Sequence, residues 1–374
     1  MKFVLAPDSF KECMSSKEVC EVMESGIRKV YPEAEIIKVP MADGGEGTVE
    51  ALVEATSGTY HTVNVTGPLG NKVDAVFGVL GNKKTAVIEM ATASGLHLVK
   101  REERNPLITT TFGTGELIKA ALDLGVKHIV IGIGGSATND GGAGMIQALG
   151  GKLLDREGNE IGFGGGSLDK IETIDLSQID SRIKDTVIEV ACDVTNPLIG
   201  EKGASEIFGR QKGATEEMVK VLDSNLAHYA NVIKRDLDID IAYVEGAGAA
   251  GGLGAALLAF LNGELKRGID LVIKHTELKE KLEGADYVFT GEGSIDYQTM
   301  YGKTPIGVAT IAKEKGVKTI AFAGNVGEGI DILYTGGITA IFSIMLGVST
   351  LENALKNGKE NLLVTVENAV RLLG

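Results

Sequence analysis

The sequence predicts an α/β protein of two domains, and three observations lead to this fold class. The chain has 374 residues, about twice the usual size of a domain. Short apolar runs alternate with helical patterns near both ends of the chain, which is typical of proteins built on a parallel sheet. The 51 glycines gather where apolar runs end, at points where the backbone must turn sharply or approach a ligand.

The N-terminal region has the pattern of a strand, a helix and a second strand. Lys2–Ala6 and Ile36–Val39 are short apolar runs that predict strands, and Ser15–Val30 begins with capping residues and continues with helical periodicity. The Gly- and Asp-rich segment Asp43–Thr48 then leads into a predicted helix over Val49–Ala55. In such proteins the ligands sit beyond the carboxyl ends of the strands.

The middle of the chain has a different pattern of apolar runs and turn residues. Its first part predicts a short antiparallel meander over Thr62–Val65, Val73–Val79 and Thr85–Glu89, with turn residues between the runs. The elements expected after it are a helix over Glu116–Leu124, strands over His128–Ile133 and Val187–Cys192, and a long helix over Glu216–Leu237.

The last third returns to the regular alternation of the first. The predicted strands are Tyr287–Thr290, Thr319–Ala323 and Ala340–Ser343, and the predicted helices are Pro305–Lys315 and Glu360–Leu373. Because the two ends resemble each other, we predict a discontinuous Rossmann-like domain formed by residues 1–60 and 285–374. A mixed α/β domain, residues 61–284, is inserted between them.

Charge and cysteine content exclude several classes of partner. The chain has 37 Lys and Arg against 51 Asp and Glu, and its net charge of −14 disfavours binding to nucleic acid or anionic membranes. Cys13, Cys20 and Cys192 show no metal-binding or disulfide spacing, which fits a reducing compartment. With no apolar run of secretory or membrane-spanning length, a cytoplasmic location is expected.

One Gly-rich loop has the pattern of an anion site. Gly134, Gly135 and Ser136 follow the predicted strand over His128–Ile133, and Asp140 precedes a helix start. Backbone N–H groups exposed by glycines at a helix start bind phosphate. The alternative is a tight turn in which Asp140 caps the helix.

A second Gly-rich loop allows three interpretations. Gly246–Gly251 has the G-x-G-x-x-G spacing after the strand-like run Ile241–Glu245. Gly248 and Gly251 could pack a helix closely, cradle a phosphate, or bind a dinucleotide such as NAD. The chain has no Walker A sequence, because the Gly-Lys-Thr at Lys303 lacks the required glycine at position 297.

Acidic residues stand at the ends of several predicted strands, and each could also be a turn or capping residue. Phosphoryl transfer needs carboxylates that hold Mg²⁺ and one that accepts the proton of the attacking hydroxyl. The candidates are Asp8, Asp43, Glu46, Asp193, Glu292 and Asp296. Cations that could offset phosphate or carboxylate charge, unless they are only solvated surface residues, are Lys11, Lys303, Arg210 and Lys212.

Taken together, these motifs resemble the bacterial glycerate kinases of the glycerate 2-kinase type. The resemblance runs from end to end. It is carried by APDSFK at Ala6–Lys11, PMADGGEGT at Pro40–Thr48, AVIEMATASGL at Ala86–Leu96, RNPL and FGTGELI within Arg104–Ile118, IGIGGSATNDGGAGM at Ile131–Met145, ACDVTNPLIG at Ala191–Gly200, GAGAAGGLG at Gly246–Gly254, TGEGSIDYQT at Thr290–Thr299 and GKTPIGVA at Gly302–Ala309. Two positions depart from the family pattern: Ser294 stands where Arg is common, and Arg210 where Pro is frequent.

The resemblance implies a two-domain α/β fold with the active site in the cleft between the domains. It implies ATP, Mg²⁺ and D-glycerate as ligands and a phosphoglycerate as product, with 2-phosphoglycerate favoured over 3-phosphoglycerate. Together with the acidic net charge, this leaves glycerate and ATP as the expected partners, with no nucleic acid or membrane, and a homodimer is one option for the assembly.

We assign roles to the matched residues as hypotheses. Asp296 is the general base, Lys11 and Lys303 offset the charge of the transferred phosphoryl group, and Asp193 and then Asp43 hold Mg²⁺. The nucleotide phosphates are assigned to Gly134, Gly135, Ser136, Asp140, Gly248 and Gly251, and the substrate to Ser9, Asp43, Glu46, Arg210 and Glu292. Two other functions stay open: an NAD-dependent dehydrogenase that uses Gly246–Gly251, and a sugar-acid sensor without catalysis.

Overall fold

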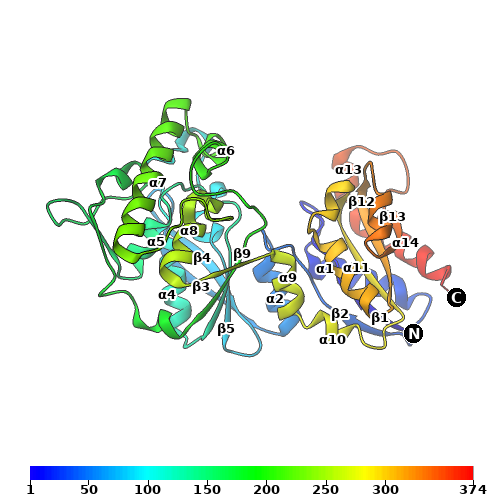
Figure 1. Cartoon of the computed structure of the whole chain (residues 1–374). Helices are drawn as coiled ribbons and strands as arrows, with labels where there is room; N and C mark the ends of the chain where they lie inside the picture. Colours follow the sequence, from blue (N-terminus) through cyan, green and yellow to red (C-terminus); the bar gives the residue numbers. More distant parts are fainter. Residues whose placement is uncertain (374) are drawn as a thin grey trace. The chain divides into compact units, whose positions relative to one another are not determined.

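The computed structural model describes residues 1–373 and divides the chain into two compact units. Unit 1 is formed by Met1–Ser57 and the segment from Arg267 onward, and unit 2 by Gly58–Lys266. In Figure 1 the blue start of the chain and its orange and red end accordingly lie together in unit 1. Both units have mixed α/β structure.

The units divide at 57/58 and 266/267, whereas the domains were predicted to divide at 60/61 and 284/285. The larger difference concerns the segment 267–284, which carries α9 (Gly268–His275) and α10 (Leu278–Lys281). Helix α9 packs against α2 (Thr48–Thr56) and α11 (Thr304–Glu314) of unit 1. Long-range packing of this kind leaves no trace in local composition.

Unit 1 is built on a five-stranded sheet of order β13-β12-β11-β1-β2, in which every pair is parallel. The strands are β1 (Lys2–Leu5), β2 (Glu35–Lys38), β11 (Tyr287–Ile295), β12 (Lys318–Val326) and β13 (Ile338–Ser343). All five predicted strands of the two chain ends are therefore confirmed. Strand order runs outward in both directions from the β1–β11 pair, which makes that pair the topological switch point of the sheet.

Helices cover both faces of this sheet. They are α1 (Ser16–Arg28), α2, α9, α10, α11, α12 (Asp331–Thr335), α13 (Leu351–Lys356) and α14 (Gly358–Arg371). Along β12 the side chains alternate: Ile320 and Phe322 pack with residues of α1 and α14, whereas Ala321 and Ala323 pack with residues of α11 and α12. This alternation is the two-residue period of a strand that is buried on both faces.

Unit 2 contains a six-stranded sheet of order β10-β9-β6-β5-β4-β3 and a two-stranded sheet of β7 and β8. The strands are β3 (Thr59–Thr66), β4 (Lys72–Val79), β5 (Thr85–Glu89), β6 (His128–Gly132), β7 (Lys152–Leu154), β8 (Thr173–Asp175), β9 (Val187–Ala191) and β10 (Glu264–Lys266). Strands β3, β4 and β5 pair antiparallel, which confirms the predicted meander. The pairs β5–β6, β6–β9 and β9–β10 are parallel, so the sheet is mixed.

The helices of unit 2 enclose a large apolar core on this sheet. They are α3 (Ala91–Ser94), α4 (Phe112–Asp123), α5 (Ala143–Ala148), α6 (Ala204–Phe208), α7 (Glu216–Leu237) and α8 (Ala249–Leu261), with 3-10 turns η1 (Leu96–Leu98), η2 (Arg101–Glu103), η3 (Gly165–Lys170), η4 (Ser181–Asp185) and η5 (Arg210–Lys212). The predicted long helix over Glu216–Leu237 is confirmed residue for residue. None of the described helices in either unit combines the length and apolar character that crossing a membrane requires.

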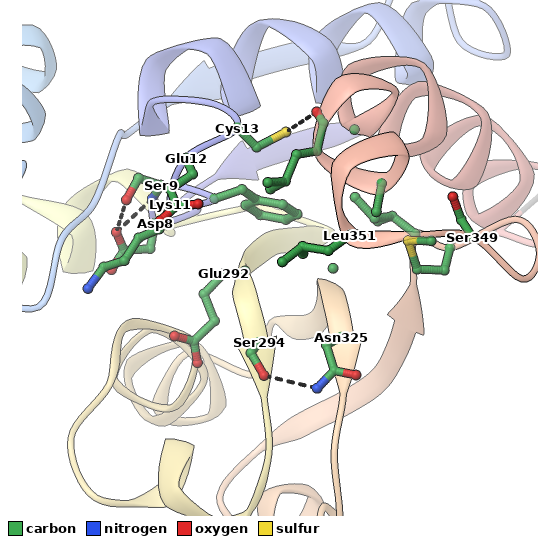
Figure 2. A pocket seen from close by; sticks show the side chains of 18 of the residues that line it. Asp8, Ser9, Lys11, Glu12, Cys13, Glu292, Ser294, Asn325, Ser349 and Leu351 are labelled. Carbon is green, nitrogen blue, oxygen red and sulfur yellow. Dashed lines mark hydrogen bonds between the residues drawn. The ribbon is translucent and has the colours of Figure 1, made fainter.

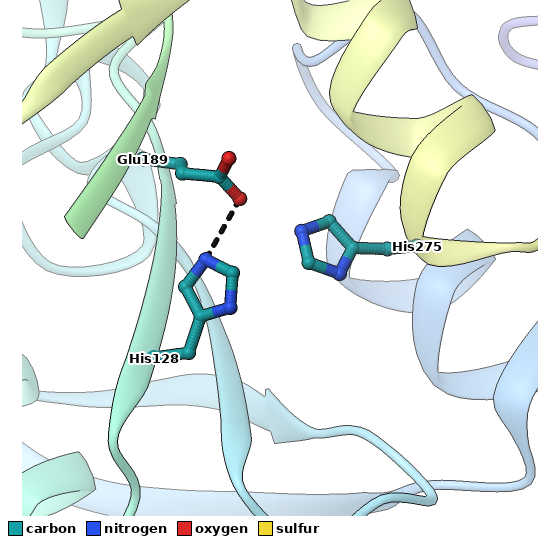
Figure 3. Close-up of side chains that lie close together, drawn as sticks. All are labelled: His128, Glu189 and His275. Carbon is teal, nitrogen blue, oxygen red and sulfur yellow. Dashed lines mark hydrogen bonds and ion pairs between the residues drawn. The ribbon is translucent and has the colours of Figure 1, made fainter. Parts of the chain in front are cut away.

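A buried carboxylate joins three neighbouring strands of unit 2. Glu189 on β9 is 1% exposed, and its Oε2 lies 2.7 Å from His128 Nε2 on β6 (Figure 3). Its other oxygen accepts a hydrogen bond of 2.6 Å from Lys266 Nζ on β10. A buried charge needs such partners, because an unpaired carboxylate in the interior is costly.

The structure explains the second Gly-rich loop by close packing. Residues 241–248 form turns, so the predicted strand over Ile241–Glu245 is wrong, and with it the strand-loop-helix context of a dinucleotide site. A Cβ on Gly251 would lie 2.0 Å from the Thr138 carbonyl oxygen, and one on Gly248 would lie 2.1 Å from that of Pro197. Both glycines are buried, and their predicted contact with nucleotide phosphates stays a prediction.

Replacement of Gly251 by Ala should test this packing. Gly251 has φ +70 and a carbonyl oxygen in the way, whereas Gly158 has φ +82 with no atom within 4 Å of an added Cβ. We expect Gly158→Ala to cost about 1 kcal/mol of unfolding free energy from the left-handed backbone alone. Gly251→Ala should cost at least ~3 kcal/mol, because steric overlap is added. Equal losses in urea unfolding would show that the contact with Thr138 is not tight.

Candidate active site

A pocket of about 620 Å³ opens at the carboxyl ends of the strands of unit 1. Figure 2 shows Asp8, Ser9 and Lys11, which follow β1, facing the pocket from one side, and Glu292 and Ser294 on β11 facing it from another. The pocket thus lies at the switch point between β1 and β11. This is the place where open α/β sheets bind their ligands.

The pocket has a polar half and an apolar half. The charged and polar side chains of the lining are those of Asp8, Ser9, Lys11, Glu12, Asp43, Glu46, Glu292, Ser294, Lys303, Asn325, Ser349 and Thr350. The apolar lining is formed by Phe10, Ile344, Met345, Leu351, Ala354 and Leu355. Five carboxylates against two lysines make the polar half acidic, which favours a bound cation beside an anionic substrate.

Asp8 is held in place by its neighbours at the end of β1. Its Oδ1 accepts a hydrogen bond of 2.6 Å from the Ser9 backbone N–H, and its Oδ2 accepts one of 2.5 Å from Thr304 Oγ1. Burial, reinforced by the nearby negative charge of Asp43, raises the pKa of Asp8 to about 6. The hydrogen bonds from Thr304 and Ser9 act in the opposite direction.

Glu292 lies on β11, the strand that pairs with β1, and is 14% exposed. Its Oε2 is 3.4 Å from Lys303 Nζ, and its Oε1 accepts a hydrogen bond of 3.0 Å from Thr299 Oγ1. Burial raises the pKa of Glu292 to about 7 although Lys303 favours the charged form. A carboxylate with this pKa can both accept and release a proton near neutral pH.

The structure therefore brings together six of the residues that the sequence assigned to the site. They are Ser9, Lys11, Asp43, Glu46, Glu292 and Lys303. It also adds Asp8, which was noted only as an acidic residue at a strand end. The sequence signal for Asp8 was its place directly after the first buried strand, but its proton affinity depends on burial and on Thr304, 296 residues further along the chain.

Asp296, the predicted general base, has a different environment. It is not among the lining residues of the pocket, and its Oδ1 accepts a hydrogen bond of 2.8 Å from the Gln298 backbone N–H. It thereby caps the 3-10 turn η6 (Tyr297–Met300). This is the turn-capping alternative that the sequence left open, and a catalytic role for Asp296 stays a prediction.

The residues of the first Gly-rich loop lie in unit 2, at the end of β6. Gly134 and Gly135 are exposed there, whereas Ser136 is 7% exposed and accepts a hydrogen bond of 2.7 Å from Lys212 Nζ. Lys212 also donates to the Thr138 carbonyl at 2.6 Å, and burial lowers its pKa to about 7. The buried Lys212 thus holds the loop through Ser136 and Thr138, while Gly134 and Gly135 are exposed to solvent.

Asp140 is completely buried and organises the start of α5. Its Oδ2 accepts hydrogen bonds from the backbone N–H of Thr111 at 2.8 Å and from the Thr111 hydroxyl at 2.9 Å, and its Oδ1 accepts one from Gly142 N–H. Burial raises its pKa. These contacts correspond to the capping alternative for Asp140, and its predicted contact with phosphate stays a prediction.

Two further predicted site residues lie apart from the pocket of unit 1. Asp193 follows β9 and is exposed. Arg210 lies on η5, where its guanidinium pairs with Glu206 and Glu216 at 3.0 and 2.7 Å. Both belong to unit 2, so the pocket of unit 1 by itself contains only Asp43 of the two predicted metal ligands.

Comparison with known proteins identifies the family. A model of the glycerate kinase family matches residues 3–374. The chain belongs to the glycerate kinase family. It is 54% identical over 373 residues to glycerate 2-kinase of Escherichia coli (strain K12), covering 100% of this chain and 98% of that protein. It is 55% identical over 360 residues to glycerate kinase of Bacillus subtilis (strain 168), covering 96% and 94% of the two chains.

The fold is also similar to a solved structure. A crystal structure from Salmonella typhimurium LT2, provisionally assigned there to glycerate kinase 2, superposes with a TM-score of 0.93 at 53% identity. The similarity covers 100% of this chain and 98% of the other. The mixed α/β architecture of both units is therefore that of a glycerate kinase family member.

The raised pKa of Glu292 predicts how stability depends on pH. The pKa rises from 4.5 to about 7 on folding, so between these values the folded protein holds a proton that the unfolded chain has released. Stability must therefore fall as pH rises through this window. Glu292→Gln removes the effect, and its unfolding free energy relative to wild type should rise by up to about 3 kcal/mol between pH 5 and pH 8.

The matched control is Glu314→Gln, because Glu314 is 53% exposed and forms only a surface ion pair with Lys279. The difference in unfolding free energy between the Glu314→Gln variant and wild type should stay nearly constant with pH. A Glu292→Gln variant whose relative stability is equally flat would contradict the burial of a protonated Glu292.

Proposed function

We propose that this chain is a glycerate kinase that transfers the terminal phosphoryl group of ATP to the 2-hydroxyl of D-glycerate in the presence of Mg²⁺. The acceptor rests on the relatives named glycerate kinase, one of them glycerate 2-kinase, which match it over nearly their full lengths. The observation that carries the chemistry is the switch-point pocket, where two partly buried carboxylates of raised pKa share the lining with Lys11 and Lys303.

Glu292 is the general base that the pocket supports best. In the transfer, the 2-hydroxyl oxygen of glycerate bonds to the terminal phosphorus of ATP while the bond to the bridging oxygen of ADP breaks. The hydroxyl proton passes to Glu292, whose pKa of about 7 suits this role. Lys303, 3.4 Å from Glu292, and Lys11 offset the negative charge that develops on the phosphoryl oxygens.

The carboxylates of the pocket fit a magnesium ion. Mg²⁺ usually takes one or two protein carboxylates and completes its shell with water and phosphate oxygens. Asp43 lines the pocket and is the proposed ligand there, and Asp193 is the second proposed ligand. When bound, Mg²⁺ would neutralise phosphate charge.

Five further predicted residues are assigned to substrate and nucleotide. Ser9 and Glu46 line the same pocket as Glu292 and are proposed to bind the hydroxyl groups of glycerate. The exposed turn of Gly134 and Gly135, followed by Ser136, is proposed to cradle the phosphates of ATP, because exposed glycine N–H groups bind anions.

The finer points of fold, assembly and location are also proposals. The parallel sheet of unit 1 with helices on both faces supports a Rossmann-like domain, into which unit 2 is inserted. A cytoplasmic location is supported by an ATP-dependent reaction and by three cysteines that form no disulfide within the described residues. The position of the active site between the domains and a homodimeric assembly stay predictions.

Phosphorus NMR of the reaction product tests the function directly. With D-glycerate, ATP and Mg²⁺ we expect a phosphomonoester on carbon 2 of glycerate and an equivalent amount of ADP, and no product after chelation of the metal. A 3-phosphoglycerate product would correct only the regiochemistry. Glycerate binding without transfer would instead support the sensor, and thermal stabilisation by NAD(H) but not by ATP would support the dehydrogenase.

Two isosteric variants distinguish the candidate bases. We expect Glu292→Gln to lower kcat by at least about 10²-fold, the usual contribution of a general base, and Asp296→Asn to lower it less than about tenfold. The wild-type kcat should fall as pH drops below about 7, because Glu292 becomes protonated. If steady-state kinetics show a larger loss of kcat for Asp296→Asn than for Glu292→Gln, the general base is Asp296.

A further inference from the structure

Unit 2 contains a second cavity, of about 400 Å³, with three arginines in its wall. Its lining residues are Leu96, Arg101, Arg104, Arg210, Gln211 and Gly213, and no carboxylate is among them. In a chain whose net charge is −14, three guanidinium groups around one cavity are unexpected. The cavity is therefore locally suited to an anion.

Arg104 has an unmet hydrogen-bond requirement. Its Nε is buried and has no hydrogen-bond partner within residues 1–373, and its NH1 reaches the Gln211 carbonyl only at 3.4 Å. Gly213, at φ +94, lies so close that an added Cβ would be 2.3 Å from the Arg104 carbonyl oxygen. Gly213 thus packs against the backbone of Arg104, and an acceptor in the cavity would satisfy the buried Nε of its guanidinium.

The other two arginines differ from each other. Arg101, on η2, is exposed and forms no ion pair with any residue that the structure describes. Arg210 is already occupied, since its Nε and NH2 bond to Glu216 at 2.7 and 2.8 Å and its NH1 bonds to the Glu206 carbonyl at 2.7 Å. Arg101 and Arg104 are thus the two groups with capacity for a ligand, and Arg210 forms part of the wall.

The cavity adjoins the exposed Gly-rich turn. The backbone N–H of Leu96, one of its lining residues, donates to the Gly135 carbonyl at 2.8 Å. Lys212, between the lining residues Gln211 and Gly213, donates to Ser136 Oγ at 2.7 Å. The arginines and the glycine turn are therefore parts of one connected structure.

We propose that Arg101 and Arg104 form an oxyanion-binding subsite beside the Gly134–Ser136 turn. The ligand is a carboxylate or a phosphate, which a planar guanidinium binds through two parallel hydrogen bonds. In the reaction proposed above, on which this inference rests, the oxyanion is either the carboxylate of glycerate or a phosphate of ATP.

Isothermal titration calorimetry of the full chain with D-glycerate and, separately, with ATP tests this subsite. For one of the two ligands, Arg104→Gln should weaken binding by about 10- to 100-fold, the loss of a charge-assisted hydrogen bond. Arg101→Gln should weaken binding of the same ligand by about three- to fivefold, because Arg101 is exposed. The affected ligand identifies the source of the oxyanion.

The matched control is Arg156→Gln, a surface arginine of the same unit that is 85% exposed and paired with Glu172. It should bind both ligands as wild type does. The subsite is refuted if wild type binds neither ligand, or if Arg101→Gln and Arg104→Gln both match the control. Should Arg104→Gln fail to fold, Arg101→Gln decides alone. Weakened binding in a protein that shows no phosphoryl transfer would support the subsite and refute the kinase.

Discussion

The parallel pairing of β1 with β11 is the interaction on which the rest of unit 1 depends. It aligns Phe3, Val4 and Leu5 with Tyr287, Val288 and Phe289 and so joins parts of the chain 284 residues apart. Neighbouring strands lead away from this pair in opposite directions, so the segments that follow β1 and β11 diverge and leave a pocket between them. In the sequence, the whole of unit 2 lies between β1 and β11.

The same pairing brings two acidic side chains into a poorly solvated place. Asp8 follows β1, Glu292 lies on β11, and burial is the largest cause of the raised pKa of each. Nearby carboxylates reinforce the effect, because the charge of Asp8 raises the pKa of Glu292 and the charge of Asp43 raises the pKa of Asp8. Lys303 and Thr304, at the start of α11, limit the shift enough for a proton to be exchanged near neutral pH.

Electrostatic character differs between the two candidate binding places. The pocket of unit 1 is rich in carboxylates and favours a cation beside the reacting group, whereas the cavity of unit 2 has arginines and favours an anion. In the phosphoryl transfer proposed above, the first would suit a metal beside the reacting group, and the second would suit an anionic end of a substrate. The net charge of the chain, −14, does not reveal this difference between the two sites.

Local patterns predicted most elements, because strands buried on both faces and capped helices leave strong signals. The run Phe3–Leu5 and the capping box of Ser15 with Glu18 are examples. The strand over Ile241–Glu245 was wrong, because this segment forms turns in which Ile241 packs on the core while Tyr243 and Val244 are exposed.

Within the candidate site, residues close to strand ends were foreseeable, but their surroundings were not. Asp296 resembled Glu292 in sequence, and only the fold shows that one caps a turn while the other faces the pocket. The environment of Arg104 depends in the same way on Gly213, over a hundred residues further along the chain. Desolvation and long-range contacts of this kind are properties of the folded chain.

We propose that the fold holds Glu292 as a proton acceptor near neutral pH. This proposal is tested most directly by carbon-13 NMR titration of glutamate carboxyl groups in the labelled protein, with the Glu292→Gln variant used to assign the signal. We predict a transition for Glu292 near pH 7. A transition near 4.5, the ordinary value for glutamate, would show that burial in the fold does not raise the pKa of Glu292.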